Sequence, residues 1–439
     1  MSAASLKIGL AGFGTVGSGV YNTLKRNHDL IQRRTGGRFA LEITKIAVRD
    51  MKKKRDADAP TELFTGDWRE VVNSPDVDIV VELIGGTTDA YDLVEAALKN
   101  GKPVVTGNKA LLAELGPELF ALSSKYKVPI HFEAAVAGGI PIIRTIQDSF
   151  VGNQIERFTG IINGTSNYML ERMTKGGLSY EAALAEAQDK GYAEADPALD
   201  VNGWDAAHKA ILLASLAYGF PIDPTDVYVR GIQKVRPIDV SFAEKLGYVI
   251  KLLSIVRHHD DGRIELRTQP CFLPTEHILA SVNGVFNAVA LHGDAVGESM
   301  FYGEGAGQDP TASSVMADIV EAARAIESGA HHRGYLPYSE TGEVVPIDET
   351  IGSFYVRFDV TDRPGVIAEI AKVIADAGLG ISGTSSPVNS KDPDAEFRDM
   401  VFLIHSCAFG LLKKTLKKIE KLDCVNSRPV VFRIETTGC

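Results

Sequence analysis

Cysteine is scarce in this chain of 439 residues, and its few copies form no motif. The four cysteines, Cys271, Cys407, Cys424 and Cys439, are far apart and show no CxxC spacing. Such usage argues against a disulfide framework and a cysteine-based structural zinc site, and it is typical of a reducing compartment. We therefore expect a reduced, cytoplasmic protein. An alternative concerns Cys439, whose terminal position would let an exposed thiol cross-link two subunits under oxidation.

The sequence also lacks long apolar runs and an excess of positive charge. No stretch of about 18 apolar residues occurs, so we expect no transmembrane helix. The start "MSAASLKIGLAGFG" lacks the long apolar core of a signal peptide. The net charge of -11 argues against nucleic acid and anionic membrane surfaces as partners. The net charge does not exclude small anionic ligands, because an acidic protein can carry a local basic pocket.

What the chain does contain is a regular alternation of strand-like and helix-like segments near its start. Its length indicates roughly two to four domains. Helical patterns such as 90–101 separate the strand-like segments, and this order predicts βαβ units with a parallel sheet. We expect residues 1–145 to form an α/β, doubly wound domain of the Rossmann type, completed by an amphipathic helix over 309–330. The strand-like segments are 6–11, 41–50, 76–85 and 102–108.

The middle of the chain, residues 146–308, mixes strands and helices less regularly, which predicts an α+β domain. A segment rich in Gly, Pro and polar residues follows and reads as a linker over 331–350. Residues 351–436 then show the order βαββαβ, the order of a small ferredoxin-like domain. The expected strands of the middle part are 154–164, 227–233, 264–273 and 287–295, and its expected helices are 179–190, 204–218 and 240–250.

A glycine motif follows the first expected strand. Gly12, Gly14 and Gly17 form GxGxxG at the start of a helix pattern that runs to about Asn27. The first glycine allows a tight turn, the second lets the backbone approach a pyrophosphate, and the third lets helix and strand pack closely. The position within a βαβ unit favours dinucleotide binding over the alternative, glycines that only make a turn.

The end of the second expected strand bears on the choice of dinucleotide. Arg49 precedes Asp50, and Lys52, Lys53, Lys54 and Arg55 follow. An acid at this place binds the ribose hydroxyls of NAD, whereas an arginine accommodates the extra phosphate of NADP. The basic excess favours NADP. The alternative is that the lysines lie on a solvated loop and that Asp50 selects NAD.

The segment "YAEADPALDVNGWDAAHKA" places several acids ahead of one lysine. Asp205 and Lys209 are four residues apart, and therefore on one face of the helix expected over 204–218. They can form an ordinary surface ion pair, or they can offer a carboxylate and an ammonium to one pocket. The apolar sequence that follows, "AILLASLAYGF", favours an internal helix. Asp196 and Asp200 fit a turn or supporting positions near the start of the helix.

Taken in order, the motifs resemble those of one family. They are "GLAGFGTVGSGV", "VVELIGG", "VVTGNKALLA", "HFEAAVAGGIPII", "GIINGTSNYML", "EADPALDVNGWDAAHKAILLA" and "YGEGAGQDPTASSVMAD". The chain resembles bacterial homoserine dehydrogenases of the long form, which end in an ACT domain. The resemblance implies the reversible interconversion of L-homoserine and L-aspartate 4-semialdehyde with NAD(P)(H), in threonine, methionine and isoleucine biosynthesis.

The resemblance also implies roles for individual residues. The catalytic lysine of the family corresponds to Lys209, and a lysine near the nicotinamide corresponds to Lys109. Backbone carbonyls that hold a monovalent cation, usually Na+, correspond to Glu133, Val136, Gly138 and Ile140. The substrate-binding residues correspond to Glu194, Asp205, Asn163, Gly164 and Thr165. The cofactor-binding residues correspond to Gly12, Phe13, Gly14, Thr15, Val16, Gly17, Arg49, Lys109 and Gly307.

Elementary chemistry agrees with these roles. The ammonium of an amino-acid substrate needs a carboxylate, and Glu194 is a sensible partner. The substrate hydroxyl must lose a proton as hydride leaves the same carbon. A lysine such as Lys209, with Lys109 beside it, can take that proton, and such assistance contributes roughly 10²–10⁴-fold. A non-catalytic sensor built from a dinucleotide domain and an ACT domain is the competing class. Another dehydrogenase of amino-acid semialdehydes is the runner-up among enzymes.

The C-terminal module carries the regulatory expectation. Asp362 and Gly365 lie at a strand-to-helix turn, where helix N–H groups can receive a ligand carboxylate. The resemblance implies feedback inhibition by L-threonine, and a homodimer or homotetramer. The sequence after "GLGIS" departs from the family pattern with a polar, Pro-containing loop. The alternative is therefore a module that only mediates subunit contacts.

Overall fold

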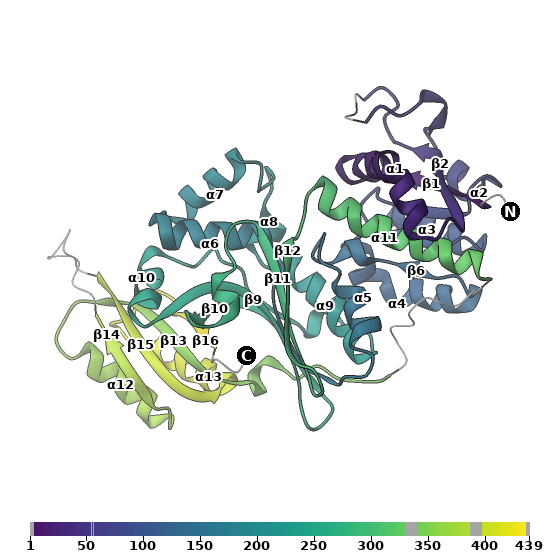
Figure 1. Cartoon of the computed structure of the whole chain (residues 1–439). Helices are drawn as coiled ribbons and strands as arrows, with labels where there is room; N and C mark the ends of the chain where they lie inside the picture. Colours follow the sequence, from purple (N-terminus) through teal and green to yellow (C-terminus); the bar gives the residue numbers. More distant parts are fainter. Residues whose placement is uncertain (1–3, 54, 56, 330–339, 387–396, 436–439) are drawn as a thin grey trace. The chain divides into compact units, whose positions relative to one another are not determined.

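The computed structural model describes residues 4–53, 55, 57–329, 340–386 and 397–435 (Figure 1). The chain divides into two compact units, and each draws on three separate stretches of sequence. Part of the expected linker, and Cys439, lie outside the described residues. The first unit is Met1–Gly164, Asp205–Pro224 and Val285–Gly342, and the second is Thr165–Trp204, Thr225–Gly284 and Glu343–Cys439.

The first unit is built on a six-stranded parallel sheet. Its strand order is β3-β2-β1-β4-β5-β6, the order of a Rossmann fold. The expected strands at 6–11, 41–50, 76–85 and 102–108 are β1, β2, β4 and β5. The strands are β1 (Ala4–Ala11), β2 (Phe39–Ala47), β3 (Phe64–Thr65), β4 (Ile79–Glu82), β5 (Val104–Thr106) and β6 (Ile130–His131).

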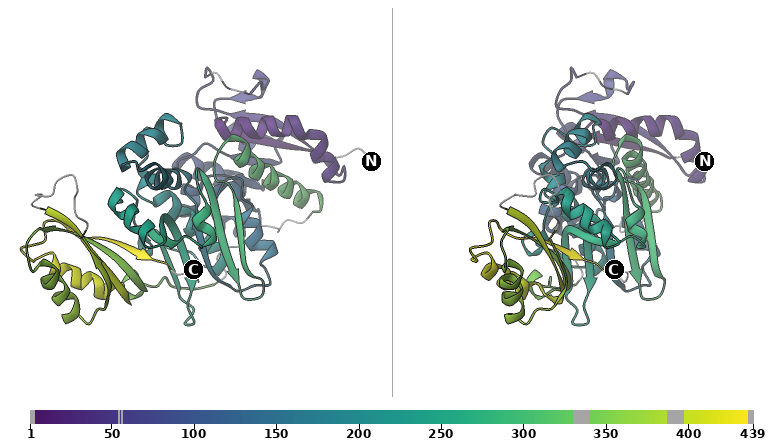
Figure 2. Two further views of the ribbon diagram at one scale, coloured as in Figure 1. Left: turned by 60° about the vertical axis from the view of Figure 1, so that its left-hand side comes forward. Right: turned by 90° about the vertical axis from the view of Figure 1, so that its left-hand side faces the viewer.

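Helices cover this sheet. One of them, α11, comes from much later in the chain and packs on α1, as the green and purple ribbons show (Figures 1 and 2). Their contact needs Gly19 in α1, since an added Cβ there would lie 2.7 Å from Cγ of Gln308. The helices are α1 (Thr15–Arg34), α2 (Arg69–Asn73), α3 (Thr88–Lys99), α4 (Lys109–Tyr126) and α11 (Gln308–Glu327).

The first unit also holds a short antiparallel arrangement and the helix that carries Lys209. Strand β11 pairs with β7 on one side and β12 on the other. Helix α9 (Trp204–Tyr218) is buried along most of its length, as its apolar sequence predicts. The remaining elements are β7 (Ile155–Ile161), β11 (Phe286–Gly293), β12 (Gly297–Glu304), α5 (Ile142–Arg144) and the short turns η1 (Thr61–Leu63), η2 (Glu133–Ala135) and η3 (Thr145–Ser149).

The second unit is built on a mixed sheet in the order β9-β10-β16-β13-β15-β14, with β8 also paired to β10. A helix was expected at 240–250, but α10 ends at Lys245 and a long strand starts at Tyr248. The strands are β8 (Tyr228–Val229), β9 (Tyr248–His258), β10 (Ile264–Pro274), β13 (Ile351–Thr361), β14 (Ile381–Ser385), β15 (Phe397–Ala408) and β16 (Val430–Ile434).

Helices and short turns complete the second unit. The strand expected at 227–233 is reduced to the two residues of β8. The helices are α6 (Gly164–Gly176), α7 (Tyr180–Asp189), α8 (Ala198–Val201), α10 (Pro237–Lys245), α12 (Val366–Asp376) and α13 (Phe409–Ile419). The turns are η4 (Pro224–Asp226), η5 (Ile278–Ser281) and η6 (Ile347–Glu349).

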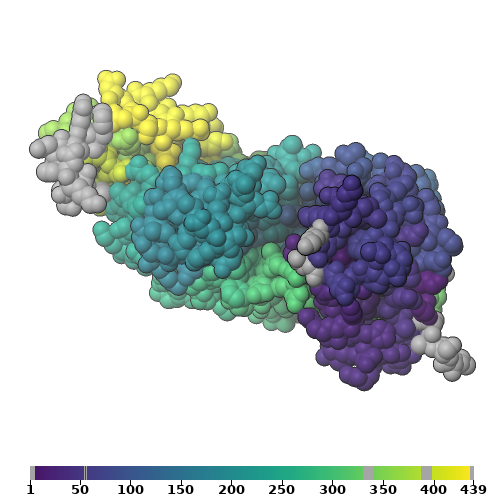
Figure 3. All heavy atoms as spheres, turned by 90° about the horizontal axis from the view of Figure 1, so that it is seen from above, coloured from purple at the N-terminus to yellow at the C-terminus, as the bar shows by residue number. Residues whose placement is uncertain are grey.

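The C-terminal part of the second unit has the order β13-α12-β14-β15-α13-β16, the expected βαββαβ. The atoms at the end of the described chain, coloured yellow, lie together in Figure 3. Its edge strand β16 pairs in parallel with β10, so its sheet continues into the preceding part of the unit. Five charged side chains stand at this junction, four of them almost fully buried. They are Arg257, Glu265, Arg267, Arg433 and Glu435.

Among the described residues, no helix combines the length and the apolar character needed to cross a bilayer.

Candidate active site

The glycine motif forms a tight turn between β1 and α1. Gly12 has φ +101°, and an added Cβ would lie 2.3 Å from the Leu83 carbonyl oxygen. A Cβ on Gly17 would lie 2.2 Å from the Gly12 carbonyl oxygen. Around Gly14 nothing lies within 4 Å of an added Cβ. Two of the glycines are therefore required by the protein's own packing, whereas Gly14 faces open space.

The turn suits an anionic ligand. Helix α1 starts at Thr15, and no acidic residue lies in its first turn. Its first N–H groups and dipole therefore face the turn without a competing carboxylate. Phe13 is buried and packs edge-on against Tyr21 and Phe64, so this residue offers only its backbone to a ligand. The open Gly14 and the uncapped helix start fit the pyrophosphate of a dinucleotide.

The residues after β2 lie where a dinucleotide's ribose would be read. Arg49 and Asp50 are both exposed. The Asp50 carboxylate accepts a hydrogen bond from the Lys52 amide at 2.8 Å, and the Arg55 guanidinium donates to the Asp50 carbonyl. Both an arginine and an acid are therefore available at this place. Lys54 lies outside the described residues.

A Lys–Asp–Lys bridge lies at the start of α9, with Asp205 and Lys209 buried and the Lys109 side chain 36% exposed. Asp205 Oδ2 is 2.7 Å from Lys209 Nζ, and Asp205 Oδ1 is 3.1 Å from Lys109 Nζ. Lys209 also donates to the Ile162 carbonyl at 2.8 Å, and Asn163 Nδ2 donates to Asp205 Oδ2 at 2.8 Å. The sequence named four of these five residues. The structure brings them together from α4, α9 and the loop after β7.

Burial sets the electrostatics of this bridge. Asp205 is 7% exposed and Lys209 is 8% exposed, so they do not form a surface ion pair. Burial raises the pKa of Asp205, but the ammonium groups of Lys209 and Lys109 outweigh it and hold that pKa well below its ordinary value. The carboxylate therefore stays ionised and keeps two ammonium groups near one point.

The other residues expected to bind substrate divide between the units. Gly164 belongs to the first unit, and an added Cβ would lie 2.6 Å from the Val285 carbonyl oxygen. Thr165 and Glu194 belong to the second unit. The Thr165 hydroxyl donates to the Tyr192 carbonyl at 2.7 Å, which ties the start of α6 to the acidic segment.

The acidic segment itself is exposed around Glu194, whose backbone carbonyl accepts a hydrogen bond from Gln188. Asp196 accepts a hydrogen bond from the Ala198 amide at 3.1 Å, which stabilises the turn before α8. The Asp200 carbonyl accepts one from the Ser166 hydroxyl at 2.8 Å. The Asp196 carboxylate therefore stabilises the local turn, as the sequence predicted, whereas the Asp200 contact involves its backbone carbonyl.

The segment expected to hold a cation follows β6 and winds tightly. Ala137 and Gly138 both have positive φ, 54° and 50°, a conformation that non-glycine residues rarely adopt. A Cβ on Gly138 would meet the Gly305 carbonyl at 2.5 Å. Ser314 of α11 donates to the Gly138 carbonyl at 2.7 Å. The Ile140 carbonyl accepts a hydrogen bond from the Ile142 amide at 2.8 Å, so the carbonyls of Gly138 and Ile140 each have a donor within the protein.

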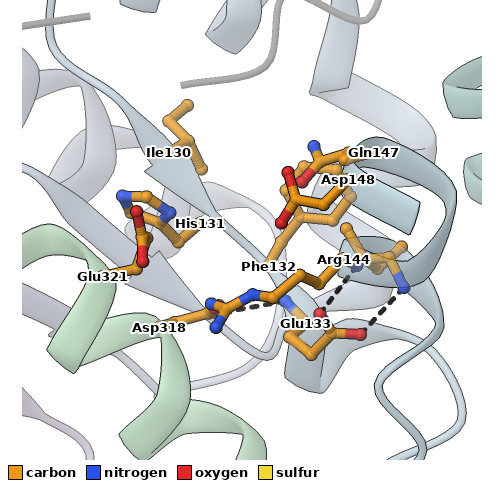
Figure 4. A pocket seen from close by; sticks show the side chains of 10 residues that line it. Ile130, His131, Phe132, Glu133, Arg144, Gln147, Asp148, Asp318 and Glu321 are labelled. Atoms are coloured by element: carbon orange, nitrogen blue, oxygen red, sulfur yellow. Dashed lines mark hydrogen bonds and ion pairs between the residues drawn. The ribbon is translucent and has the colours of Figure 1, made fainter. Parts of the chain in front are cut away.

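Glu133 places its side chain elsewhere, in a separate cavity of about 480 Å³ (Figure 4). Its carboxylate accepts hydrogen bonds from the amides of Ile143 and Arg144. Its own amide donates to Asp318 of α11 at 2.8 Å. Only the backbone carbonyl of Glu133 can therefore take part in the expected cation site.

Gly307 precedes α11 and has φ +118°. The next residue, Gln308, lies against Gly19 of α1, so the segment from Gly305 to Gln308 stands beside the helix that follows the glycine turn. This is compatible with the expected return of the segment to the cofactor.

Sequence reasoning missed a set of polar residues behind these features. Glu82, Thr106 and Asn108 are buried at the ends of β4 and β5, next to Lys109. The available signal was an acid at the end of an otherwise apolar run, "DIVVELIG".

The sheet order, the glycine turn and the two lysines joined by buried Asp205 define an oxidoreductase that uses a nicotinamide dinucleotide. Comparison with known proteins is more specific. Residues 12–133 match the family profile "Homoserine dehydrogenase, NAD binding domain", and residues 141–320 match the profile "Homoserine dehydrogenase". The chain belongs to the homoserine dehydrogenase family and is an NAD(P)-dependent oxidoreductase.

Individual relatives match over nearly the whole chain. The homoserine dehydrogenase of Pseudomonas aeruginosa is 41% identical, over 98% of this chain and 99% of its own. The crystal structure of a homoserine dehydrogenase from Thiobacillus denitrificans matches with 40% sequence identity and a TM-score of 0.92, over 100% of both chains. A hyperthermophilic archaeal homoserine dehydrogenase, solved in complex with NADPH, has 26% identity and a TM-score of 0.61, over 73% of this chain and 98% of its own.

Proposed function

We propose that this enzyme interconverts L-homoserine and L-aspartate 4-semialdehyde, as part of threonine, methionine and isoleucine biosynthesis. The observation that carries the proposal is the bridge in which the buried carboxylate of Asp205 joins Lys209 and Lys109. Two lysine side chains beside one fixed carboxylate can stabilise an alkoxide by their positive charge, and one of them can exchange a proton with the substrate oxygen. The family membership makes homoserine the first substrate to test.

The proposed roles follow from the contacts. In the proposed reduction, the Lys209 ammonium donates a proton to the alkoxide that forms as hydride arrives, and in oxidation the neutral Lys209 amine takes that proton back. Lys109 adds positive charge beside the same oxygen. Asp205 orients both lysines, and Asn163 fixes the Asp205 carboxylate. Glu194 binds the substrate ammonium, while Gly164 and Thr165 shape the adjoining loop. When bound, the nicotinamide accepts or supplies the hydride.

NADP is the proposed preferred cofactor, with NAD as a second possibility. The exposed Arg49 supports this choice, because a guanidinium can pair with a 2′-phosphate. The exposed Asp50 supports NAD, since a carboxylate accepts hydrogen bonds from ribose hydroxyls. The turn residues Gly12 to Gly17 contact the pyrophosphate in either case, and Gly307 lies toward the nicotinamide.

A monovalent cation, with Na+ as the first candidate, is proposed at the carbonyls of Glu133, Val136, Gly138 and Ile140. The consecutive positive φ angles at Ala137 and Gly138 support it, because they bend this backbone sharply. Carbonyl oxygens suit a hard cation. The cation would brace the turn between the dinucleotide sheet and α11.

The C-terminal βαββαβ unit is proposed to be an ACT domain that binds L-threonine and inhibits the enzyme. Gly365 starts α12 with φ +93°, and Asp362 pairs with Arg398 at the same turn. Part of the departing loop, 387–396, lies outside the described residues. We propose domains at 1–145 with 309–330, 146–308 and 351–436, joined by the linker 331–350, in a homodimer or homotetramer.

One assay tests the proposal. Purified enzyme is mixed with L-homoserine and either NAD or NADP, with and without L-threonine, and reduced nicotinamide is followed by absorbance. We expect turnover with both cofactors, a higher kcat/KM with NADP, and inhibition by threonine. No turnover of homoserine with either cofactor would overturn the substrate assignment. Loss of only the threonine effect would overturn the regulatory part alone.

A further inference from the structure

Glu82 is a fully buried carboxylate in the middle of the dinucleotide sheet. It ends β4, with Ala11 of β1 beside it on one side and Thr106 of β5 on the other. Its side chain is 0% exposed, and this burial raises its pKa. A buried acid is costly unless it is fully hydrogen-bonded, so its partners indicate what it does.

Those partners come from the end of β5 and from the loop after β4. Glu82 Oε2 accepts a hydrogen bond from the Thr106 hydroxyl at 2.5 Å. Glu82 Oε1 accepts from the amides of Ile84 at 2.9 Å and Gly85 at 3.4 Å. One carboxylate thus fixes the loop after β4 and the loop after β5 at the same edge of the sheet.

The second loop leads directly to Lys109. The Thr106 hydroxyl, which donates to Glu82, accepts from the Asn108 amide at 3.0 Å. The Asn108 side chain accepts from the Leu111 amide at 3.1 Å and so caps α4, whose first residue is Lys109. Asn108 Nδ2 also donates to the Gly86 carbonyl at 2.7 Å, which returns the network to the first loop.

The first loop leads to the glycine turn. The Leu83 amide, next to Glu82, donates to the Ala11 carbonyl at 2.7 Å. The Leu83 carbonyl stands so close to Gly12 that an added Cβ would lie 2.3 Å from it. The position of the loop after β4 therefore determines the position of the turn that starts α1.

From these contacts we propose that Glu82 and Thr106 are positioning residues, which hold the glycine turn and Lys109 in register for hydride and proton transfer. Glu82 and Thr106 do not touch the reacting atoms. They act through Lys109 on one side and through Gly12 on the other. The catalytic half of the inference rests on the proposed function, because that function assigns Lys109 its role.

Thr106→Val tests the proposal with little change in shape, because it replaces the relay hydroxyl by a methyl group. Thr106→Ser keeps the hydroxyl. Thr268→Val is the matched control, since Thr268 is also fully buried and its hydroxyl bonds Ser254 at 2.8 Å, but in the second unit. Each variant is measured for melting temperature, kcat, KM for homoserine and dinucleotide Kd by fluorescence.

We expect Thr106→Val to lower kcat by about tenfold or more, because small misplacements of reacting groups are costly. Its dinucleotide Kd should rise by about threefold or more. Thr106→Ser should restore both, and Thr268→Val should change neither, although the two Val variants lose similar thermal stability. If Thr106→Val matches Thr268→Val in kcat and Kd, these residues are only structural and the proposal is wrong.

A double-variant cycle tests whether Thr106 affects kcat through Lys109. If Thr106 acts through Lys109, adding Thr106→Val to Lys109→Met produces no further loss of kcat. Independent, multiplying losses would overturn the link, as would wild-type kcat in Lys109→Met. If the unaltered enzyme does not oxidise homoserine, the proposed function fails instead. The Kd comparison still decides then, because equal Kd values for Thr106→Val and Thr268→Val would overturn the positioning of the glycine turn.

Discussion

Asp205 and Lys209 lie one turn apart on α9, and their side chains meet at 2.7 Å in a buried setting. In sequence, such a pair has the spacing of a common surface ion pair worth a few tenths of a kcal/mol. Burial changes its character, because a buried charge must be paired or used. The approach of Lys109 to the other oxygen of Asp205 turns the pair into a compact, charge-rich site.

Within the glycine turn, Gly14 is expected to matter for cofactor binding and not for folding. Gly14 has φ -85°, outside the left-handed region, and an added Cβ would meet nothing within 4 Å. We expect Gly14→Ala to keep the wild-type melting temperature. Its dinucleotide Kd should rise by about tenfold or more, since the methyl group occupies the place where the backbone approaches the pyrophosphate. Fluorescence titration with NADPH measures the Kd.

Gly66→Ala is the matched control for this variant. Gly66 also has open space around an added Cβ and no positive φ. It should change neither the melting temperature nor the Kd. Wild-type Kd in Gly14→Ala would contradict the assignment of the turn to the cofactor.

The buried charged residues between β10 and β16 are expected to contribute strongly to the stability of the second unit. Arg267 is 0% exposed and lies 2.8 Å from Glu435, which is 3% exposed. Glu435→Gln leaves Arg267 and its neighbour Arg257 with less negative charge, so we expect a loss of about 3 kcal/mol in the free energy of unfolding. Urea unfolding followed by circular dichroism measures it.

The control is an ion pair in the same unit that solvent reaches. Arg263 and Glu349 lie 3.0 Å apart with side chains 34% and 54% exposed. Glu349→Gln should cost at most about 1 kcal/mol. If the two Gln variants are equally stable, the buried cluster does not hold β16 to β10.

The lowered pKa of Lys251 predicts that the stability of the protein depends on pH. Burial lowers its pKa from 10.5 to about 8, while Glu171 opposes that shift and Lys175 adds to it. Between about pH 8 and 10.5, the unfolded chain therefore binds a proton that the folded protein does not. Stability from this group must rise with pH across that window. The gain should be about 1–2 kcal/mol from about pH 7 to about pH 9.5.

Lys251→Met lacks this titration. The variant loses the hydrogen bonds to Asn167 and to the Val282 carbonyl at every pH, which adds a constant difference. The stability advantage of the wild type should nevertheless grow as pH rises. Urea unfolding of both proteins at the two pH values measures the difference. A difference that stays constant between them would contradict the pKa assignment.

Much of the fold could be predicted because local patterns agree with it. The apolar runs of the first sheet and the GxGxxG turn carry their structure in a few neighbouring residues. Three local predictions were wrong, one of them the strand expected at 227–233, which is reduced to the two residues of β8. The first helix was expected to end at about Asn27, but the backbone only kinks there, with φ -111° and ψ 15°, and α1 continues to Arg34. Strand β9 begins at Tyr248, within the expected helix. Its start was missed because a strand that is buried on both faces shows no alternation of polar and apolar residues.

The candidate site was less predictable from the residues alone. The spacing of Asp205 and Lys209 is local, but the approach of Lys109 from α4 depends on how the chain folds as a whole. The same holds for Glu82, whose three donors come from β5 and from the loop after β4. Motif resemblance supplied the first set. Glu82 lies within the motif "VVELIGG", but the resemblance assigned it no role.

The most direct test of the account is the turnover of Lys209→Met. We expect Lys209→Met to lower kcat for homoserine oxidation by about 10²-fold or more and to leave the dinucleotide Kd unchanged. Lys99→Met is the matched control, because Lys99 forms an i,i+4 pair with Glu95 at 2.8 Å in the same unit but is half exposed, and it should keep full activity. Wild-type turnover in Lys209→Met would contradict the central claim that Lys209 carries the proton.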